Sequence, residues 1–285
     1  MLLRMRFHRP LILVRSGMPH LFAAAFCVSF LIAAISAGHA QECPASSDAL
    51  GVSRIISIDP TEHPRIGSAQ YAESLPLQDH ELVLTFDDGP IEPYTGKVLD
   101  ALAAECLKAT FFVVGKMAKE FPELVRRAYR EGHTIGTHTE NHAHLDLIRP
   151  EAARKEIREG IASVSKVLGS GGAAAPFFRF PYLDETRLAE DFALKQGLMV
   201  WSADSFISDW TMATPQKIIE AVTTAIERKK KGIVLLHDIQ EKTALALPSL
   251  LSELKKRRYH IVHIVPADAT HPKTETKAEQ WAAID

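Results

Sequence analysis

The chain has 285 residues, of which 46% are hydrophobic and 24% are charged, as in an ordinary globular protein. This length allows one large domain or two small ones. Because the formal net charge is only -2, the sequence gives no reason to expect a nucleic-acid-binding protein.

The first 40 residues have the pattern of an export signal. Four arginines precede an apolar run at 21–37, and no acidic residue occurs before Glu42. Since Gly38 and Ala40 suit a signal peptidase site, we expect 1–40 to be a cleaved signal peptide and the protein to be periplasmic or secreted, without a membrane contact after cleavage. The alternative is an uncleaved anchor, although the apolar run is short for a bilayer, which needs about 20 residues.

Two cysteines follow this segment, Cys43 and Cys106. They could form a disulfide in an oxidising compartment. Cys106 lies between apolar neighbours, however, and is equally typical of a buried thiol. The residues before Cys43 do not form a lipobox, so we do not expect a lipoprotein.

Beyond the signal, short apolar runs alternate with amphipathic stretches. Residues 41–80 contain several prolines and predict an irregular lead-in segment wrapped on the main domain. The candidate strands are 82–86, 109–114, 134–137, 177–180, 198–202, 233–237 and 260–265. The clearest helical patterns are 151–168, 215–228 and 248–258, the last two beginning with a proline.

This alternation predicts an α/β fold with a mainly parallel sheet and outer helices. Seven strands favour a distorted (β/α)7 barrel over a complete eight-stranded one. We place the domain at 81–266 and expect the polar tail, 267–285, to be loose.

Polar side chains follow the predicted strands where each strand ends. In a parallel barrel these positions lie on one face, which is where active sites are built. The residues concerned are Asp87, Asp88, His138, Arg179, Asp204 and His237. Their convergence predicts an enzyme.

Adjacent carboxylates at Asp87 and Asp88 end the first of these strands. Successive side chains of an extended chain point in opposite directions. One carboxylate can therefore bind a cation while the other faces a water molecule. The alternative interpretation is a simple turn, since Asp88-Gly89 is a common turn signal.

Histidines at His138 and His142 are four residues apart. On one face of a helical turn they would chelate a single ion. Two histidines and one aspartate leave coordination positions open, and this N/O set suits Zn²⁺ and also Co²⁺, Ni²⁺ or Mn²⁺. Thr139 could brace the loop through a side-chain to backbone hydrogen bond. We leave the nearby His144 outside the coordination shell.

Four sequence motifs then occur in a specific order. They are TFDDGP at 85–90, HTENH at 138–142, RFPY at 179–182 and LLHD at 235–238. In this combination the sequence resembles the polysaccharide deacetylase family, the carbohydrate esterases of family 4 that contain a NodB homology domain. The resemblance extends over about 81–265.

For the metal and the base, the resemblance implies one role for each matching residue. Asp88, His138 and His142 would hold a divalent cation, most simply Zn²⁺. Asp87 would be the general base that removes a proton from water.

For the remaining motifs, the resemblance implies that His237 is the general acid and that Arg179 orients Asp87. On the substrate side, the backbone N–H of Tyr182 would contribute to the oxyanion hole. Leu235 would line the pocket for the acetyl methyl group, and Pro181 belongs to the same substrate-binding motif.

The fourth motif of the family departs from its usual spacing. Two extra residues separate Asp204 from Asp209. Either acid could pair with Arg179, and we prefer Asp204 as the catalytic partner because it lies nearest the strand end. The alternative for Asp209 is a loop or helix cap. Trp201 and Trp210 could be sugar-stacking platforms or buried core residues.

The sequence allows two roles for Asp238. Asp238 could orient the imidazole of His237 or could cap a turn.

These observations predict a metal-dependent hydrolase that removes N- or O-linked acetyl groups from an extracytoplasmic polysaccharide. The alternatives are a hydrolase of a small non-peptide amide and an inactive carbohydrate-binding relative. Six motif residues are retained, which disfavours the second alternative: Asp87, Asp88, His138, His142, Arg179 and His237.

Overall fold

The computed structural model describes residues 48–284, and the signal-peptide prediction and Cys43 lie outside this range. Cys106 is disulfide-bonded, so its interpretation as a free buried thiol is wrong. No helix within 48–284 has the length and apolarity needed to cross a membrane.

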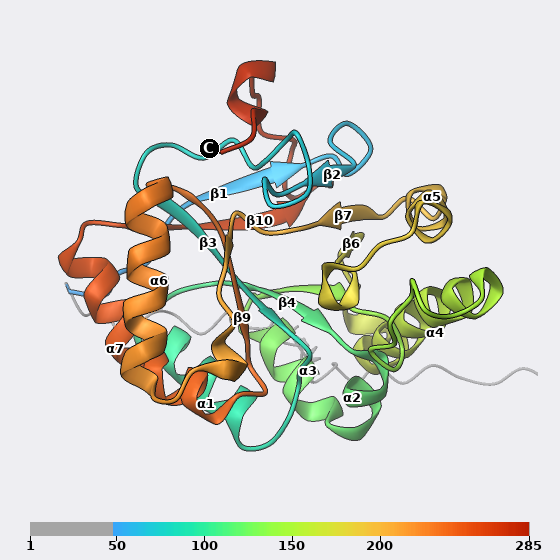
Figure 1. The fold of residues 1–285 in the computed structure, drawn as a ribbon, viewed down its shortest axis with the longest axis horizontal. Coiled ribbons are helices and arrows are strands. Elements are labelled where there is room, and N and C mark those ends of the chain that lie inside the picture. Colours follow the sequence, from blue (N-terminus) through green and yellow to red (C-terminus); the bar gives the residue numbers. More distant parts are fainter. Residues whose placement is uncertain (1–47, 285) are drawn as a thin grey trace, which may run out of the picture. The chain divides into compact units, whose positions relative to one another are not determined.

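Seven parallel strands form the frame of the fold (Figure 1). They are β3 (Glu81–Asp87), β4 (Thr110–Val113), β5 (Thr134–Thr137), β6 (Phe177–Phe178), β7 (Met199–Trp201), β8 (Ser205–Phe206) and β9 (Gly232–His237). Hydrogen bonds connect β3 through β4, β5 and β6 to β7, and connect β3 through β9 to β8. Within the described residues no ladder joins β7 to β8. The prediction of a distorted seven-stranded α/β barrel is therefore confirmed, with the ring open at this point.

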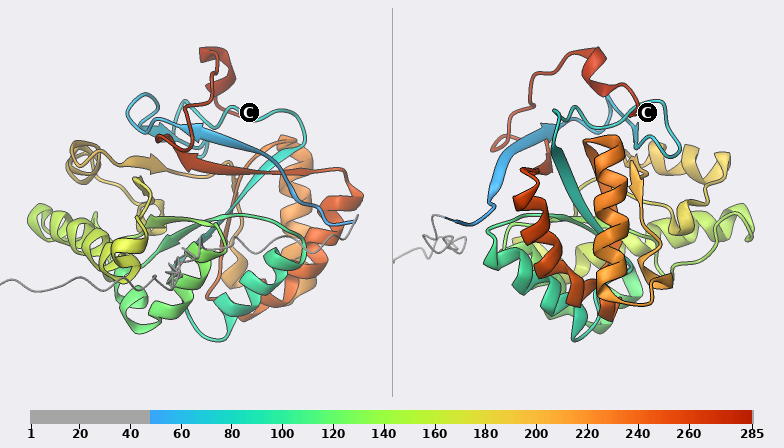
Figure 2. Two further views of the ribbon diagram at one scale, coloured as in Figure 1. Left: turned by 180° about the vertical axis from the view of Figure 1, so that it is seen from behind. Right: turned by 60° about the vertical axis from the view of Figure 1, so that its left-hand side comes forward.

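Helices surround the strands, as the views in Figures 1 and 2 agree. They are α1 (Tyr94–Ala104), α2 (Gly115–Glu120), α3 (Pro122–Arg130), α4 (Pro150–Leu168), α5 (Arg187–Lys195), α6 (Pro215–Lys229) and α7 (Glu241–Lys256). Their apolar faces bury leucine, valine and isoleucine side chains against the outer faces of the strands. This burial is the main stabilising contribution to the barrel.

The helix predicted to begin at Pro248 begins seven residues earlier. In α7, Pro248 lies inside the helix. The turns before it bury Thr243, Ala244 and Leu247 against the core. This burial outweighs the loss of one backbone hydrogen bond at the proline.

The lead-in segment contains two strands that its sequence did not predict, β1 (Val52–Ile58) and β2 (Arg65–Ile66). Strand β1 pairs in parallel with β10 (His260–Pro266), and β2 pairs with β7. Strand β10 was predicted. Its ladder with β3 contains only two residue pairs, and the rest of β10 pairs with β1.

An apolar cluster fills the barrel at the amino ends of its strands. Ile56 of β1 and Ile264 of β10 pack there with Val83, Phe112 and residues of neighbouring strands. This end of the barrel is therefore closed by apolar side chains. The polar groups lie at the other end, where the strands have their carboxyl ends.

The polar tail is held against the domain, so the expectation of a loose tail is wrong. A short 3-10 helix, Ala278–Trp281, ends in a buried tryptophan. The Trp281 ring stacks on His63 with 3.5 Å between ring centroids, and its carbonyl accepts a hydrogen bond from the Ser74 N–H. One aromatic residue thus anchors an otherwise polar segment.

Two glycines allow the loop after β5 to lie against α2 and α4. A Cβ atom added to Gly160 of α4 would lie 2.5 Å from the carbonyl carbon of Thr139. At Gly115 of α2 it would lie 2.2 Å from a Glu140 carboxylate oxygen, and the Gly115 N–H donates to the Thr139 carbonyl over 2.9 Å. The backbone of this loop therefore rests directly on two helices.

Gly160→Ala is expected to destabilise the protein. In an exposed helix the change would gain about 1 kcal/mol in helix propensity. Here the methyl group would overlap the Thr139 backbone, and overpacking of this kind costs about 1–3 kcal/mol. Denaturant unfolding gives the free energy difference.

The matched control for this change is Gly171→Ala, because an added Cβ there meets no atom within 4 Å. A Gly160→Ala protein as stable as the Gly171→Ala protein would show that the close packing of the loop is not rigid.

Candidate active site

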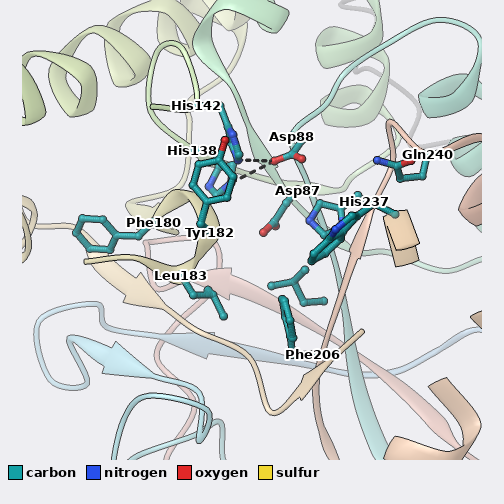
Figure 3. Close-up of a pocket in the computed structure, with 12 residues that line it drawn as sticks. Asp87, Asp88, His138, His142, Phe180, Tyr182, Leu183, Phe206, His237 and Gln240 are labelled. Carbon is teal, nitrogen blue, oxygen red and sulfur yellow. Dashed lines mark ion pairs between the residues drawn. The ribbon is translucent and has the colours of Figure 1, made fainter. Parts of the chain in front are cut away.

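A pocket of about 370 Å³ opens at the carboxyl ends of the barrel strands (Figure 3). It gathers side chains from strands and loops that are far apart in the sequence. Its lining residues are Asp87, Asp88, His138, His142, Phe180, Tyr182, Leu183, Phe206, Trp210, Leu235, His237 and Gln240. The polar residues predicted for one face therefore do meet there, except Arg179 and Asp204, which do not line the pocket.

The two adjacent aspartates point to different places. Asp87 is the buried last residue of β3, and Asp88 follows it with a φ of 76°. Aspartate tolerates this left-handed conformation better than most residues. The turn directs the Asp88 carboxylate toward the two histidines and leaves Asp87 facing the pocket (Figure 3).

Asp88, His138 and His142 form a compact group of potential ligands. The Oδ1 atom of Asp88 lies 2.9 Å from Nε2 of His142 and 3.3 Å from Nε2 of His138. Their ligand atoms all lie within 4.8 Å of one another. The segment that holds the histidines is a loop with positive φ at Thr139 and His142, so the predicted helical turn is wrong although the histidines do converge.

The hydrogen bonds around this group fit a cation. Nδ1 of His138 lies 2.7 Å from the Arg179 carbonyl oxygen. Because a carbonyl only accepts, Nδ1 has the proton and Nε2 presents its lone pair toward Asp88. The buried Asp88 Oδ1 has no hydrogen-bond partner among residues 48–284. A carboxylate and an imidazole lone pair that face each other are stabilised by a bound cation.

The charge of Asp88 also suits a metal ligand. Burial alone would raise the pKa of Asp88, but hydrogen bonds and positive charge from the His138 and His142 rings, for which a bound cation would substitute, hold that pKa well below its usual range. The carboxylate is therefore ionised at neutral pH.

Side-chain hydrogen bonds hold the loop of His138 and His142 in place. The Thr139 hydroxyl accepts a hydrogen bond from the His142 N–H over 3.1 Å, which confirms the predicted brace. Asn141 is bound by Glu156 of α4. Glu140 accepts hydrogen bonds from Ser163 and from Lys119. The loop is thus fixed by side chains as well as by its packing on two helices.

Arg179 is fully buried beneath Asp87. Its Nη1 atom donates to Asp87 Oδ1 over 2.7 Å and to the Thr85 hydroxyl over 2.8 Å, and Nη2 donates to the Ser202 carbonyl. The guanidinium also lies 4.2 Å from the centroid of the Phe112 ring. Arg179 therefore fixes the orientation of Asp87.

Asp204 does not pair with Arg179, so that expectation is wrong. Its carboxylate accepts hydrogen bonds from the N–H and hydroxyl of Ser68, the hydroxyl of Ser74 and the N–H of Ile233. The chain turns between β7 and β8 and carries this carboxylate away from the pocket. Asp204 connects the lead-in segment to β9.

Asp209 instead binds His237, a contact that we did not predict. Oδ1 of Asp209 lies 2.6 Å from Nδ1 of His237, and Oδ2 accepts from the His237 N–H and from the Thr243 hydroxyl. This geometry leaves Nε2 of His237 for the pocket. The second acid of the irregular fourth motif was the available signal, but from the sequence we considered Asp209 only as a partner of Arg179 or as a cap.

This pairing changes the protonation of His237. Burial alone would lower the pKa of His237, but the hydrogen bond and charge of Asp209, with the charges of Asp87 and Asp88, raise it to about 9. The imidazole is therefore protonated at neutral pH.

Asp238 has a structural role and does not contact His237 through a hydrogen bond. Its buried carboxylate accepts from the Gly89 N–H over 3.1 Å and from the Thr95 hydroxyl over 2.6 Å. A Cβ atom at Gly89 would lie 2.1 Å from Asp238 Oδ2. Burial raises the pKa of Asp238 to about 7. Of the two predicted roles, the turn is the one observed.

Of the residues predicted to contact the substrate, Leu235 and Tyr182 line the same pocket, and Pro181 precedes Tyr182 without lining it. Leu235 is buried in the pocket wall, and Pro181 begins a short 3-10 helix, Pro181–Leu183. Tyr182 in this helix has a φ of 60°, and its half-exposed ring stacks on His144 with 3.6 Å between centroids.

Of the two tryptophans, only one lies in the pocket. Trp201 is buried in the barrel core, so the core interpretation holds there. Trp210 is half exposed in the pocket wall.

Comparison with known proteins identifies similar proteins for most of the chain. The family model for polysaccharide deacetylases matches residues 75–201. A peptidoglycan-N-acetylglucosamine deacetylase of Bacillus cereus is 30% identical over 206 residues, which cover 70% of this chain and 72% of the relative. A chitooligosaccharide deacetylase of Rhizobium leguminosarum bv. trifolii is 35% identical over 160 residues, which cover 56% of this chain and 72% of that relative.

A solved structure shares both the fold and part of the sequence. The peptidoglycan deacetylase of Bdellovibrio bacteriovorus superposes with a TM-score of 0.69 at 29% identity. The superposition covers 84% of this chain and 68% of that one.

Asp88→Asn is expected to weaken Zn²⁺ binding by more than about 100-fold, since losses outside the ligand shell alone cost about 10–100-fold. Isothermal titration of the metal-free protein measures this affinity. The matched control is Asp184→Asn, in a second and more exposed group with His144 and Asp146. If Asp184→Asn weakened binding and Asp88→Asn did not, the metal would lie at the exposed group.

Proposed function

Because the chain belongs to the polysaccharide deacetylase family, we propose that it is a hydrolase that removes acetyl groups from an extracytoplasmic polysaccharide and depends on a divalent cation. The domain at 81–266 would be the catalytic unit. Residues 1–40 would direct the chain out of the cytoplasm.

One arrangement supports this proposal above all. The Asp88–His138–His142 group and the His237–Asp209 pair lie on two sides of the pocket, and Asp87 lies between them (Figure 3). A cation site, a carboxylate and a protonated imidazole are the three groups that amide or ester hydrolysis needs around one carbonyl.

Asp88, His138 and His142 would hold the cation, with Zn²⁺ suited to these ligands. When bound there, the cation polarises the acetyl carbonyl and makes water more acidic. Asp87 accepts the proton of the attacking water. Its hydrogen bond from Arg179 fixes the direction of the carboxylate.

The His237 imidazolium would donate its proton to the leaving nitrogen or oxygen. Its Nδ1 is bound to Asp209, so the transferable proton is on Nε2. The raised pKa keeps this proton in place at neutral pH until the leaving group becomes basic.

Substrate groups would occupy the rest of the pocket. The Tyr182 N–H would stabilise the negative charge that develops on the carbonyl oxygen. Leu235 offers an apolar surface for the acetyl methyl group, and Pro181 fixes the start of the turn that contains Tyr182.

The comparisons favour a glycan of N-acetylglucosamine as substrate. Relatives named for peptidoglycan and for chitooligosaccharides both act on N-acetyl groups of this sugar. This favours amide over ester hydrolysis and makes a small non-peptide amide a weaker alternative. Retention of the ligand group, the base and the acid disfavours an inactive carbohydrate-binding protein.

The direct test is acetate release from acetylated glycans by residues 41–285 loaded with Zn²⁺. Asp87→Asn is expected to lower kcat at least about 100-fold, because proton transfer to a positioned base contributes about 10²–10⁴-fold. Metal content should remain unchanged in this variant, since Asp87 is not a ligand. Equal activity of the wild-type and Asp87→Asn proteins on every glycan would refute the assignment of the base.

The pH profile tests the acid independently. A raised pKa extends the protonated form of His237 to higher pH, so kcat/KM is expected to fall as pH rises through about 9. In Asp209→Asn the pKa should return toward about 6.5, and the falling limb should move to lower pH. The control is Asp146→Asn, an exposed change without a contact to Asp209. A limb that stays in place in Asp209→Asn would contradict the role of this pair.

A further inference from the structure

Phe206 occupies a position between two hollows of the surface. It lies on β8 in register with Leu235 of β9, which places it beside a wall of the catalytic pocket. The same side chain lines a second, open groove along α6. In Figure 3, Phe206 lies on the side of the pocket away from His138 and His142. Any polymer leaving the pocket toward α6 therefore crosses Phe206.

An aromatic series connects Phe206 to the proposed acid. Trp210 contacts His237 edge to face, with 5.0 Å between ring centroids and an interplanar angle of 89°. Phe206 contacts Trp210 in a similar manner at 5.7 Å and 64°. Because Asp209 fixes His237, this packing also fixes the two rings.

Both rings present much of their surface to solvent. Phe206 is 47% exposed and Trp210 is 46% exposed. A single exposed aromatic residue is ordinary, but two in contact at the mouth of a pocket form an apolar surface that gains free energy when covered. Flat aromatic surfaces of this kind suit the C–H faces of a pyranose ring.

The groove beyond Phe206 has a volume of about 540 Å³, which is within the range of ligand sites. Its wall on α6 includes the small residues Ala221 and Ala225, and Met212, which follows the short 3-10 helix Asp209–Thr211, also lines it. Lys217, Glu220 and Arg228 supply polar groups along its length. This combination of small apolar and polar residues fits a hydroxyl-rich chain.

We propose that Phe206 is a stacking platform for the sugar next to the one that is deacetylated, and that the α6 groove receives the following part of the glycan. The inference rests on the proposed function and makes it more specific, because it selects an oligomer over a single sugar. Phe206 lies in the segment between Asp204 and Asp209, where this chain has two residues more than the family pattern.

The test compares tetra-N-acetylchitotetraose with the single sugar N-acetylglucosamine as substrates of the Zn²⁺-loaded protein. Phe206→Ala is expected to lower kcat/KM for the tetramer about tenfold, mainly through KM, and to lower it less for the single sugar, which has no neighbouring ring to stack. Phe206→Trp should restore the preference for the tetramer. The matched control is Leu188→Ala, which removes another half-exposed apolar side chain, on α5, outside the pocket and the groove.

A binding measurement separates this proposal from the proposed function. Calorimetric titration of the Asp87→Asn protein with the tetramer, with and without Phe206→Ala, requires no turnover. Weaker binding without Phe206 supports the platform even if the wild-type protein releases no acetate. Equal affinities in the two proteins, or an equal loss of kcat/KM on both substrates, would overturn the platform and leave deacetylation standing.

Discussion

The buried ion pair between Arg179 and Asp87 is the interaction on which the site depends. A guanidinium without solvent contact is stable in a barrel only when its N–H groups are bound, and here a carboxylate, a hydroxyl and backbone carbonyls bind them. The Arg179 carbonyl also fixes the tautomer of His138. One residue therefore positions the proposed base on one side and a proposed metal ligand on the other.

The opening of the barrel between β7 and β8 explains the unusual arrangement of the acids. Without a ladder at this point, the chain from Trp201 to Trp210 turns twice and presents two carboxylates in opposite directions. Asp204 is directed to the lead-in segment, and Asp209 is directed to His237. A local irregularity of the sheet thus supplies both a structural anchor and the partner of the proposed acid.

The sequence allowed the main features of the fold to be predicted, because long strands and amphipathic helices have clear periodic patterns. Residues at strand ends, such as Asp88 and His138, could be placed for the same reason. Strands β2 and β8 have two residues each, too few for any pattern. Strand β1 was missed for two reasons. Prolines follow it closely in the sequence, and its pairing with β10 depends on residues at the other end of the chain.

The errors at the site have a common physical origin. Asp204 and Asp209 both follow a strand, and nothing local in the sequence shows which way either carboxylate points. Their directions depend on Ser68, Ser74 and Thr243, which come from distant segments. Hydrogen bonds between elements far apart in the sequence decide the partner of each acid.

The pairing of β1 with β10 also has a consequence for the order of folding. The Ser53 hydroxyl binds a carbonyl 208 residues away, and the Ser57 N–H binds a hydroxyl 217 residues away. Contacts of such sequence separation close late, since the entropy of a long loop must be lost first. The end of the barrel opposite the pocket cannot be completed while β10 is still being synthesised. A chain with this topology stays incompletely folded through most of translation.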